Sequence, residues 1–155
     1  MFSLQSHEAL QQDREGIEQI VSTLIDEYWE WFNTQCRAVG AANQRGEKVS
    51  LGRIAPVMER KKSGDNIKTY VKWKDFGGQK IRKIIPSASK DIAKAATEDF
   101  QDSIIKRASW EAPKALELEA QLIPLRLQLY AIHEAQIRLK WVDRKLQRIS
   151  NKKAV

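Results

Sequence analysis

Two long stretches of this chain, one near each end, repeat apolar residues every seven positions, and this repeat constrains the fold more than any other feature. The first stretch contains Leu10, Ile17, Leu24 and Trp31. The second contains Leu118, Leu125, Ile132, Leu139 and Leu146. A seven-residue repeat places its apolar side chains along one face of an α-helix, and burial of that face requires a partner surface. The two stretches therefore predict two long helices that pack against each other.

The limits of these helices follow from residues that begin, end or interrupt helices. The N-terminal helix is predicted to span residues 6–40, with Gly40 as its C-terminal cap. Ser89 is a candidate N-cap at the start of a C-terminal helical region that spans residues 89–150. Pro124 lies inside the second apolar repeat and cannot donate a backbone hydrogen bond, so it is expected to kink or split that helix. We expect the long C-terminal helix to lie antiparallel to the N-terminal helix.

Between the helical regions, the apolar pattern changes to a period of two residues. Val71 and Trp73 alternate with Lys72 and Lys74, as in a β-strand with one buried face and one exposed face. Turn signals divide residues 51–86 into three strands. These signals are Ser63-Gly64-Asp65-Asn66 and Gly77-Gly78. We therefore predict an α+β fold in a single domain of residues 1–155: a long antiparallel helical hairpin with an inserted small antiparallel three-stranded sheet.

The positive charge of the chain is concentrated in the predicted sheet. The formal net charge of +7 comes from 27 Lys and Arg residues against 20 Asp and Glu residues. Residues 1–44 contain two basic and seven acidic residues, whereas residues 45–94 contain fourteen basic and five acidic residues, a net charge of +9. A second basic excess lies between Arg138 and Lys153. This asymmetry is typical of a protein that binds a polyanion, most simply nucleic acid; lysines that only solubilise the surface are the alternative.

The polar face of the predicted sheet is the candidate DNA-binding surface. Alternate residues of a strand lie about 6.5 Å apart, close to the phosphate spacing along one DNA strand. Lysines there would bind backbone phosphates, whereas Arg60 and Arg82 are the better candidates to read guanine edges. The Tyr70 ring would stack on a sugar or base, or pair with Ile84 across the sheet. The predicted DNA-binding residues are Arg60, Lys61, Lys62, Lys68, Tyr70, Lys72, Lys74, Lys80, Arg82 and Lys83.

No motif in the sequence indicates catalysis or a bound cofactor. His7 and His133 lie far apart, and no set of Cys and His residues has metal-ligand spacing. Cys36 lies among apolar residues of the first predicted helix and is interpreted as a core residue. Glu117 and Glu119 are interpreted as part of a solvated helix face. We therefore expect no enzymatic activity, no catalytic residue, no cofactor and no metal.

The N-terminal helix carries two further groups of interest. Its aromatic cluster includes Trp29 and Trp31, and the pattern fits either a buried core or a seam between two copies of the chain. Five of its charged residues are predicted to lie largely off the apolar stripe: Arg14, Glu15, Glu18, Asp26 and Glu30. Residues 1–12 have neither the basic nor the apolar region of a signal peptide, and no apolar run is long enough to span a membrane. We expect a cytoplasmic protein.

Several short motifs resemble those of the MobI-type auxiliary proteins of conjugative transfer, a family found in integrative conjugative elements and large plasmids. The motifs are Glu27-Tyr28-Trp29, Tyr70-Val71-Lys72-Trp73, Phe100, Trp110-Glu111, Glu119 and Leu125-Arg126. The resemblance covers residues 17 to 150. It implies an accessory factor, without catalytic residues of its own, that binds the origin of transfer as double-stranded DNA and helps a separate relaxase to act there.

The sequence thus leads to one expected function and two alternatives. The expected function is a non-enzymatic DNA-binding accessory factor that recognises an origin of transfer and assists a relaxase in conjugative DNA mobilisation. Its partners would be DNA, the relaxase or other conjugation proteins, and a second copy of the chain if the aromatic cluster is a seam. The alternatives are a helical, coiled-coil-like protein-interaction module and an RNA-binding or transcription-regulating protein of a mobile element.

Overall fold

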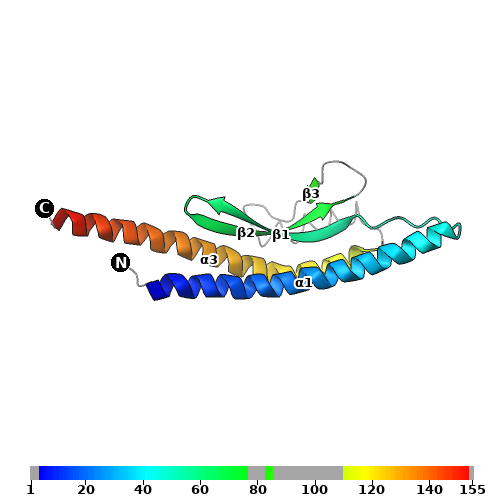
Figure 1. Ribbon diagram of the computed structural model, residues 1–155, viewed down its shortest axis with the longest axis horizontal. Coiled ribbons are helices and arrows are strands. Elements are labelled where there is room, and N and C mark those ends of the chain that lie inside the picture. The colour runs from blue at the N-terminus through cyan, green and yellow to red at the C-terminus, as the bar shows by residue number, and fades with distance from the viewer. Residues whose placement is uncertain (1–3, 77–82, 86–109, 154–155) are drawn as a thin grey trace.

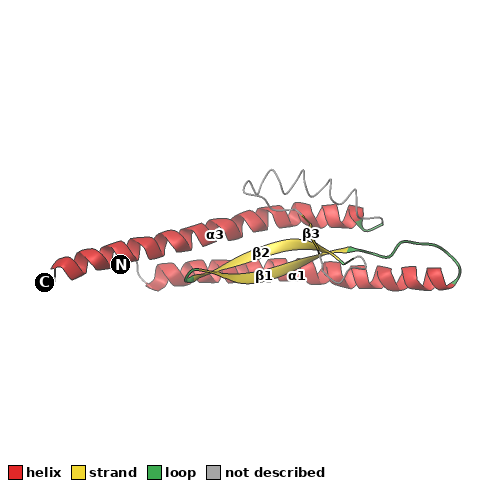
Figure 2. Ribbon diagram, turned by 90° about the horizontal axis from the view of Figure 1, so that it is seen from above, coloured by secondary structure: helices red, strands yellow, loops and turns green. Residues whose placement is uncertain are grey.

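The computed structural model describes residues 4–76, 83–85 and 110–153, and in it two long antiparallel helices lie side by side with a small sheet on one side of them (Figure 1). The elements, in chain order, are α1 (Leu4–Gln44), β1 (Ile54–Ser63), β2 (Asn66–Asp75), β3 (Lys83–Ile85) and α3 (Ala112–Lys153). Seen from above, the sheet runs along the line where the helices meet, with β1 on α1 and β2 on α3 (Figure 2). The predicted α+β class and helical hairpin are confirmed.

α1 continues past the end that the sequence predicts. Gly40 lies within the helix, and the chain leaves it only at Gly46, whose φ of +93° is the left-handed conformation of a helix cap. The amides of Arg45 and Glu47 each donate to the Ala42 carbonyl over 3.1 Å, which satisfies this end of the helix. The assignment of Gly40 as the cap was therefore wrong. A glycine inside a helix costs only about 1 kcal/mol relative to alanine, and tertiary packing outweighs that cost.

The two main strands form an antiparallel hairpin whose turn is the one that the sequence predicts. β1 and β2 pair along ten residues each, from Ile54 opposite Asp75 to Ser63 opposite Asn66. Gly64, at the turn between them, has a φ of +63°, a conformation that glycine adopts without steric cost. This long, regular pairing fixes which side chains of the hairpin face the helices and which face away.

The predicted three-stranded sheet is, in the described residues, mainly a two-stranded antiparallel sheet. β3 has three residues and pairs only with the end of β2, where Ile85 lies opposite Trp73. The earlier part of the predicted third strand, from Lys80, lies outside the described residues, as does the predicted helix that begins at Ser89. β1 and β2 are therefore the strands that position the candidate site.

The core lies between the sheet and the two helices. Its largest fully buried side chains include Trp73 of β2, Tyr28 of α1 and Leu122 of α3. The rings of Tyr28 and Trp73 meet edge to face with centroids 5.3 Å apart, and the Tyr28 hydroxyl donates to the Ile54 carbonyl over 3.1 Å. Burial of side chains of this size contributes roughly 2 kcal/mol each, so these contacts hold the sheet and both helices together.

The aromatic cluster of α1 packs within the same chain. The Trp29 indole N–H donates to the Pro56 carbonyl over 2.9 Å, and the Trp31 ring lies 5.7 Å from the Trp110 ring. Both tryptophans are half-buried against the core. Of the two alternatives that the sequence leaves open for Trp29 and Trp31, the structure therefore favours the core.

Pro124 does not split the C-terminal helix. α3 runs without interruption from Ala112 to Lys153 with Pro124 inside it. Both Pro124 and Ala120, whose carbonyl would otherwise accept the missing hydrogen bond, are exposed. Water can therefore hydrogen-bond that carbonyl, which explains why the helix tolerates a proline at this position.

Candidate nucleic-acid interface

The face of the β1–β2 hairpin that points away from the helices carries five of the ten predicted DNA-binding residues. On β2, Val71 and Trp73 are buried toward the helices, whereas the alternate residues lie on the opposite face, as the two-residue pattern predicts. The pairing register adds the matching residues of β1 to that face. We define the outer face as Glu59, Lys61, Lys68, Tyr70, Lys72 and Lys74.

Glu59 is the one acidic residue of the outer face, and three of its lysines converge on it. The Lys74 ammonium lies 2.6 Å from a Glu59 carboxylate oxygen, and the Lys72 and Lys61 ammonium groups lie 3.1 Å and 3.8 Å from the other. The hydrogen bonds from Lys74 and then Lys72 lower the pKa of Glu59 to about 2. Glu59 is therefore ionised at neutral pH, and the outer face carries four lysines against one carboxylate. The sequence analysis missed this residue.

Tyr70 lies in the middle of the same lysines. The ammonium groups of Lys72, Lys68 and Lys61 lie 5.0, 5.1 and 5.8 Å from the centroid of its ring, within cation–π range. The residue opposite Tyr70 on the neighbouring strand β1 is Glu59. The Lys72 ammonium, in turn, holds the pKa of Lys61 below its usual value. The outer face is thus a crowded cationic surface around one half-exposed aromatic ring.

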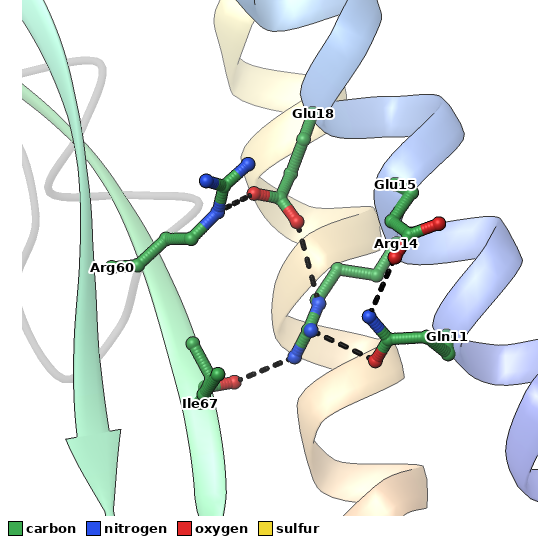
Figure 3. Close-up of polar contacts among 6 residues, drawn as sticks. All are labelled: Gln11, Arg14, Glu15, Glu18, Arg60 and Ile67. Carbon is green, nitrogen blue, oxygen red and sulfur yellow. Dashed lines mark hydrogen bonds and ion pairs between the residues drawn. The ribbon is translucent and has the colours of Figure 1, made fainter.

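Arg60 does not lie with these lysines. It is opposite Thr69 in the register, on the side that faces the helices, and its guanidinium pairs with Glu18 of α1 (Figure 3). The Glu18 side chain is only 3% exposed and also pairs with Arg14 over 3.3 Å. The sequence places Arg60 in the basic run with Lys61 and cannot reveal that a buried carboxylate of α1 binds it.

The remaining predicted contacts lie at the margins of the sheet. Lys62 is exposed near the turn, opposite Ile67. Lys83 begins β3 and lies opposite Asp75 in the register. Lys80 and Arg82 lie outside the described residues, so the structure brings together Lys61, Lys68, Tyr70, Lys72 and Lys74 of the predicted set.

A buried ion pair on α3, between Arg126 and Glu119, holds the sheet from the inner side, whereas the sequence analysis placed Glu119 on a solvated face. Arg126 and Glu119 form two bonds of 2.7 and 3.2 Å. The Arg126 Nε also donates to the Val71 carbonyl over 3.1 Å, and the Trp73 indole N–H donates to Glu119 over 2.6 Å. Glu117, in contrast, is exposed as predicted. These four groups hold β2 on α3 and so fix the direction of the outer face.

His133 of α3 belongs to the same buried region. It is 5% exposed, and its Nδ1 has no hydrogen-bond partner among the described residues. Burial lowers the pKa of His133 below its usual 6.5, and the positive charges of Lys68 and Arg14 act in the same direction, against a smaller opposing effect of Glu134. His133 is therefore neutral in the folded protein at neutral pH.

This environment predicts that acid destabilises the fold through His133. The unfolded chain binds a proton on this histidine near pH 6.5, whereas the folded chain does so only at lower pH, so protonation favours unfolding. The contribution of neutral His133 to stability is complete above the pKa of this histidine in the unfolded chain, and it falls as the pH drops below that pKa. Urea denaturation of the wild type should show lower stability as the pH falls from 7.5 towards 5.5, and His133→Gln should show a smaller decrease. An identical pH dependence of the two proteins would contradict this assignment.

The described part of the chain contains no candidate metal-binding cluster. Among residues 4–76, 83–85 and 110–153, no group of three or more His, Cys, Asp or Glu residues could hold a metal ion. Cys36 is a free, half-buried thiol that packs against the core. None of the described helices is long and apolar enough to cross a membrane.

Residues 17–140 match the sequence model of the MobI family, described as MobI protein. The chain belongs to the MobI family. The match covers most of the chain, including both main strands and much of each helix, and confirms the resemblance seen in the sequence. No curated protein and no solved structure gives a significant match. Membership of the MobI family indicates a mobilisation-related accessory protein of a mobile genetic element that moves by conjugation.

Proposed function

We propose that this chain is a non-enzymatic DNA-binding accessory factor that recognises an origin of transfer and assists a relaxase in conjugative DNA mobilisation. The observation that carries the proposal is the outer face of the hairpin, where Lys61, Lys68 and Lys72 surround Tyr70 and Lys74 lies on the same face. Family membership supplies the context of mobilisation. The protein would act in the cytoplasm, where the DNA to be transferred is prepared.

The electrostatics of the outer face support a phosphate backbone as its ligand. Three lysines crowd around a single ring, and the mutual repulsion of Lys61 and Lys72 is relieved when an anion approaches. Each lysine that neutralises a phosphate releases a condensed counterion, which is the main source of affinity in such complexes. An antiparallel two-stranded ribbon also has the dimensions to enter a major groove, so Tyr70 and its neighbours could contact base edges or sugars there.

The two helices would serve as the scaffold and as the surface for the relaxase. Ion pairs made by the buried residues Glu18 of α1 and Arg126 of α3 hold the sheet in one orientation. The solvent-facing sides of α1 and α3 remain accessible while the outer face binds DNA, because the helices lie on the opposite side of the hairpin (Figure 1). DNA and a protein partner could therefore bind at the same time, as an accessory factor requires.

A mating assay tests this function in cells. Deletion of the gene from its element is expected to lower the frequency of transfer, and wild-type protein supplied in trans should restore it. A variant with Lys68, Lys72 and Lys74 changed to glutamine should accumulate to the same level but fail to restore transfer. Full restoration by this variant would contradict the proposed role of the outer face.

The same triple variant is predicted to lose DNA affinity in vitro. The loss of three phosphate contacts should weaken binding roughly 100-fold near physiological salt and reduce the salt slope by about 2.7. The matched control changes Arg37, Arg45 and Lys48, which are exposed at the far end of the helical hairpin, to glutamine. The measurement is fluorescence anisotropy with labelled duplex DNA. Equal losses in the two variants would show that only the total charge matters and would remove the outer face from the account.

Glu59→Gln tests the same surface in the opposite direction. The Glu59 carboxylate binds the Lys72 and Lys74 ammonium groups and repels a phosphate, so its neutralisation frees two cations without adding any. The variant should bind duplex DNA more tightly than the wild type. Weaker binding would indicate instead that Glu59 is needed to position the lysines.

A further inference from the structure

The C-terminal end of α3 carries a second row of basic residues that the outer face does not include. Positions 138, 141, 145, 148 and 152 are separated by alternate steps of three and four residues, which places them along one side of an α-helix. They are Arg138, Trp141, Lys145, Arg148 and Lys152, and all five are exposed. We define them as the α3 stripe. Among the described residues, its arginines and Lys152 have no ion-pair partner, and the Lys145 ammonium lies 5.5 Å from the centre of the Trp141 ring.

The neighbouring side of the same helix segment is anchored to the rest of the protein. Lys140 donates to the Asp65 carbonyl over 2.9 Å, and Arg144 pairs with the Asp65 carboxylate over 2.8 Å, so α3 is held at the tip of the β1–β2 turn. Asp143 pairs with His7, near the start of α1. The helix therefore has a defined position here.

Beyond these anchors, α3 projects past the other elements. Because the helices are antiparallel and His7 lies opposite Asp143, the last two turns of α3 extend beyond the described start of α1 at Leu4. Figure 1 shows this end, in red, passing the turn of the sheet and rising away from α1 towards the level of the sheet. The projecting end is thus free to contact a ligand that also lies on the sheet.

A contact between Lys68 and Tyr130 relates the α3 stripe to the outer face. The Lys68 ammonium lies 5.8 Å from the ring centroid of Tyr130, so the side of α3 that bears Tyr130 adjoins the outer face. Trp141 follows Tyr130 by eleven residues and Arg148 follows it by eighteen, close to three and five full turns of the helix. Trp141 and Arg148 therefore lie on the same side of α3 as Tyr130.

The far end of the α3 stripe lies close to one repeat of duplex DNA from the side of α3 that adjoins the outer face. At a rise of 1.5 Å per residue, Arg148 and Lys152 lie about 27 and 33 Å along α3 from Tyr130. One turn of B-DNA is about 34–36 Å. A straight duplex that lies along α3 would present the same groove and the same pair of phosphate strands at both surfaces.

We propose that the α3 stripe binds the phosphate backbone of the same DNA duplex about one helical turn from the outer face. This inference rests on the proposed DNA-binding function. Between Arg138 and Lys153 there are seven basic residues and one acidic residue, and the acidic Asp143 is already paired with His7. That charge is complementary to a polyanion and disfavours close approach of the same segment from a second copy.

The test compares duplexes of two lengths with two matched variants. The stripe variant carries Lys145→Gln, Arg148→Gln and Lys152→Gln, and the control is the Arg37, Arg45 and Lys48 glutamine variant described above. On a duplex of about 30 base pairs, the stripe variant should bind roughly 100-fold more weakly than the wild type near physiological salt. On a hairpin duplex of about 6 base pairs, roughly 20 Å long at about 3.4 Å per base pair, the two should bind equally because this duplex cannot reach from the outer face to the three substituted positions.

Hydroxyl-radical footprinting on the longer duplex gives a second readout. The wild type should protect two patches of backbone about one turn apart, and the stripe variant should lose one of them. An unchanged footprint and affinity, equal losses on both duplex lengths, or a change of oligomeric state in sedimentation would overturn the inference. If the wild type binds neither duplex, the proposed function itself fails. If the wild type binds and the stripe variant binds equally well, only the proposed role of the α3 stripe fails.

Discussion

Arg126→Met is expected to lower the free energy of unfolding by about 3–5 kcal/mol, because it leaves the buried Glu119 carboxylate without its counterion. The Arg126 and Glu119 side chains are 7% and 4% exposed, and their pairing distance is 2.7 Å. In the variant, Glu119 keeps the Trp73 indole as a donor, but the Val71 carbonyl loses its bond from Arg126. Such a loss is a large fraction of the stability of a typical domain.

Chemical denaturation measures this effect, with Arg138→Met as the control. Arg138 lies on the same helix but is exposed, so its replacement should change stability by less than about 0.5 kcal/mol. Arg126→Lys keeps the charge but cannot make the two-point contact with Glu119, and it should fall between the wild type and Arg126→Met. Equal stabilities of Arg126→Met and Arg138→Met would show that the pair contributes nothing to holding β2 on α3.

Glu18→Gln is expected to destabilise the protein by about 3 kcal/mol, because it removes the carboxylate that neutralises buried Arg14 among the described residues. Glu18 is paired with both Arg14 of the same helix and Arg60 of β1 (Figure 3). Arg14 is 7% exposed and keeps its bonds to Gln11 and to the Ile67 carbonyl, so a buried cation remains without a carboxylate. The substitution hardly changes the volume of the side chain, which separates the electrostatic effect from packing.

Glu15→Gln is the matched control for this substitution. Glu15 is an exposed residue of the same helix, and its contact is a 2.8 Å hydrogen bond from Gln11, which a glutamine can also accept. The control should retain wild-type stability to within about 0.5 kcal/mol. A similar loss in the two variants, measured by urea denaturation, would contradict the role assigned to Glu18.

The sequence predicts the elements of this fold well but not the polar residues between them. The seven-residue repeats locate both long helices, and the two-residue pattern locates β2 and its buried face. Arg14 and Glu18 were expected to lie largely off the apolar stripe and Glu119 on a solvated face, because charged residues are usually exposed. They are buried because each finds a partner on another element, and a pairing of that kind depends on the tertiary structure. The seven-residue separation of Glu119 and Arg126 was the one available signal.

The candidate site was predictable to a similar extent. Strand alternation alone places Lys68, Tyr70, Lys72 and Lys74 on one face of β2, because it depends only on local geometry. The position of Glu59 among them depends on the register of β1 against β2, which the sequence analysis did not assign. Arg60 does not lie on that face because it pairs with Glu18, which is forty-two residues earlier in the chain.

The ion pairs of Glu18 and Arg126 also connect stability with the proposed function. Glu18 of α1 holds β1 through Arg60, and Arg126 of α3 holds β2 through the Val71 carbonyl. Together these contacts fix the inner face of the hairpin on both helices. The orientation of the outer face relative to the α3 stripe depends on these contacts, so the account links the rigidity of the core to the spacing of the two basic surfaces.

The measurement that tests the central claim most directly is the anisotropy of labelled duplexes titrated with the full-length protein. One duplex carries the origin of transfer of the host element, and the other is a scrambled duplex of the same composition. We predict tighter binding to the origin duplex, with an affinity that falls linearly on logarithmic axes as salt rises. Binding to neither duplex would contradict DNA recognition by this chain, and equal, salt-sensitive binding to both would contradict recognition of the origin.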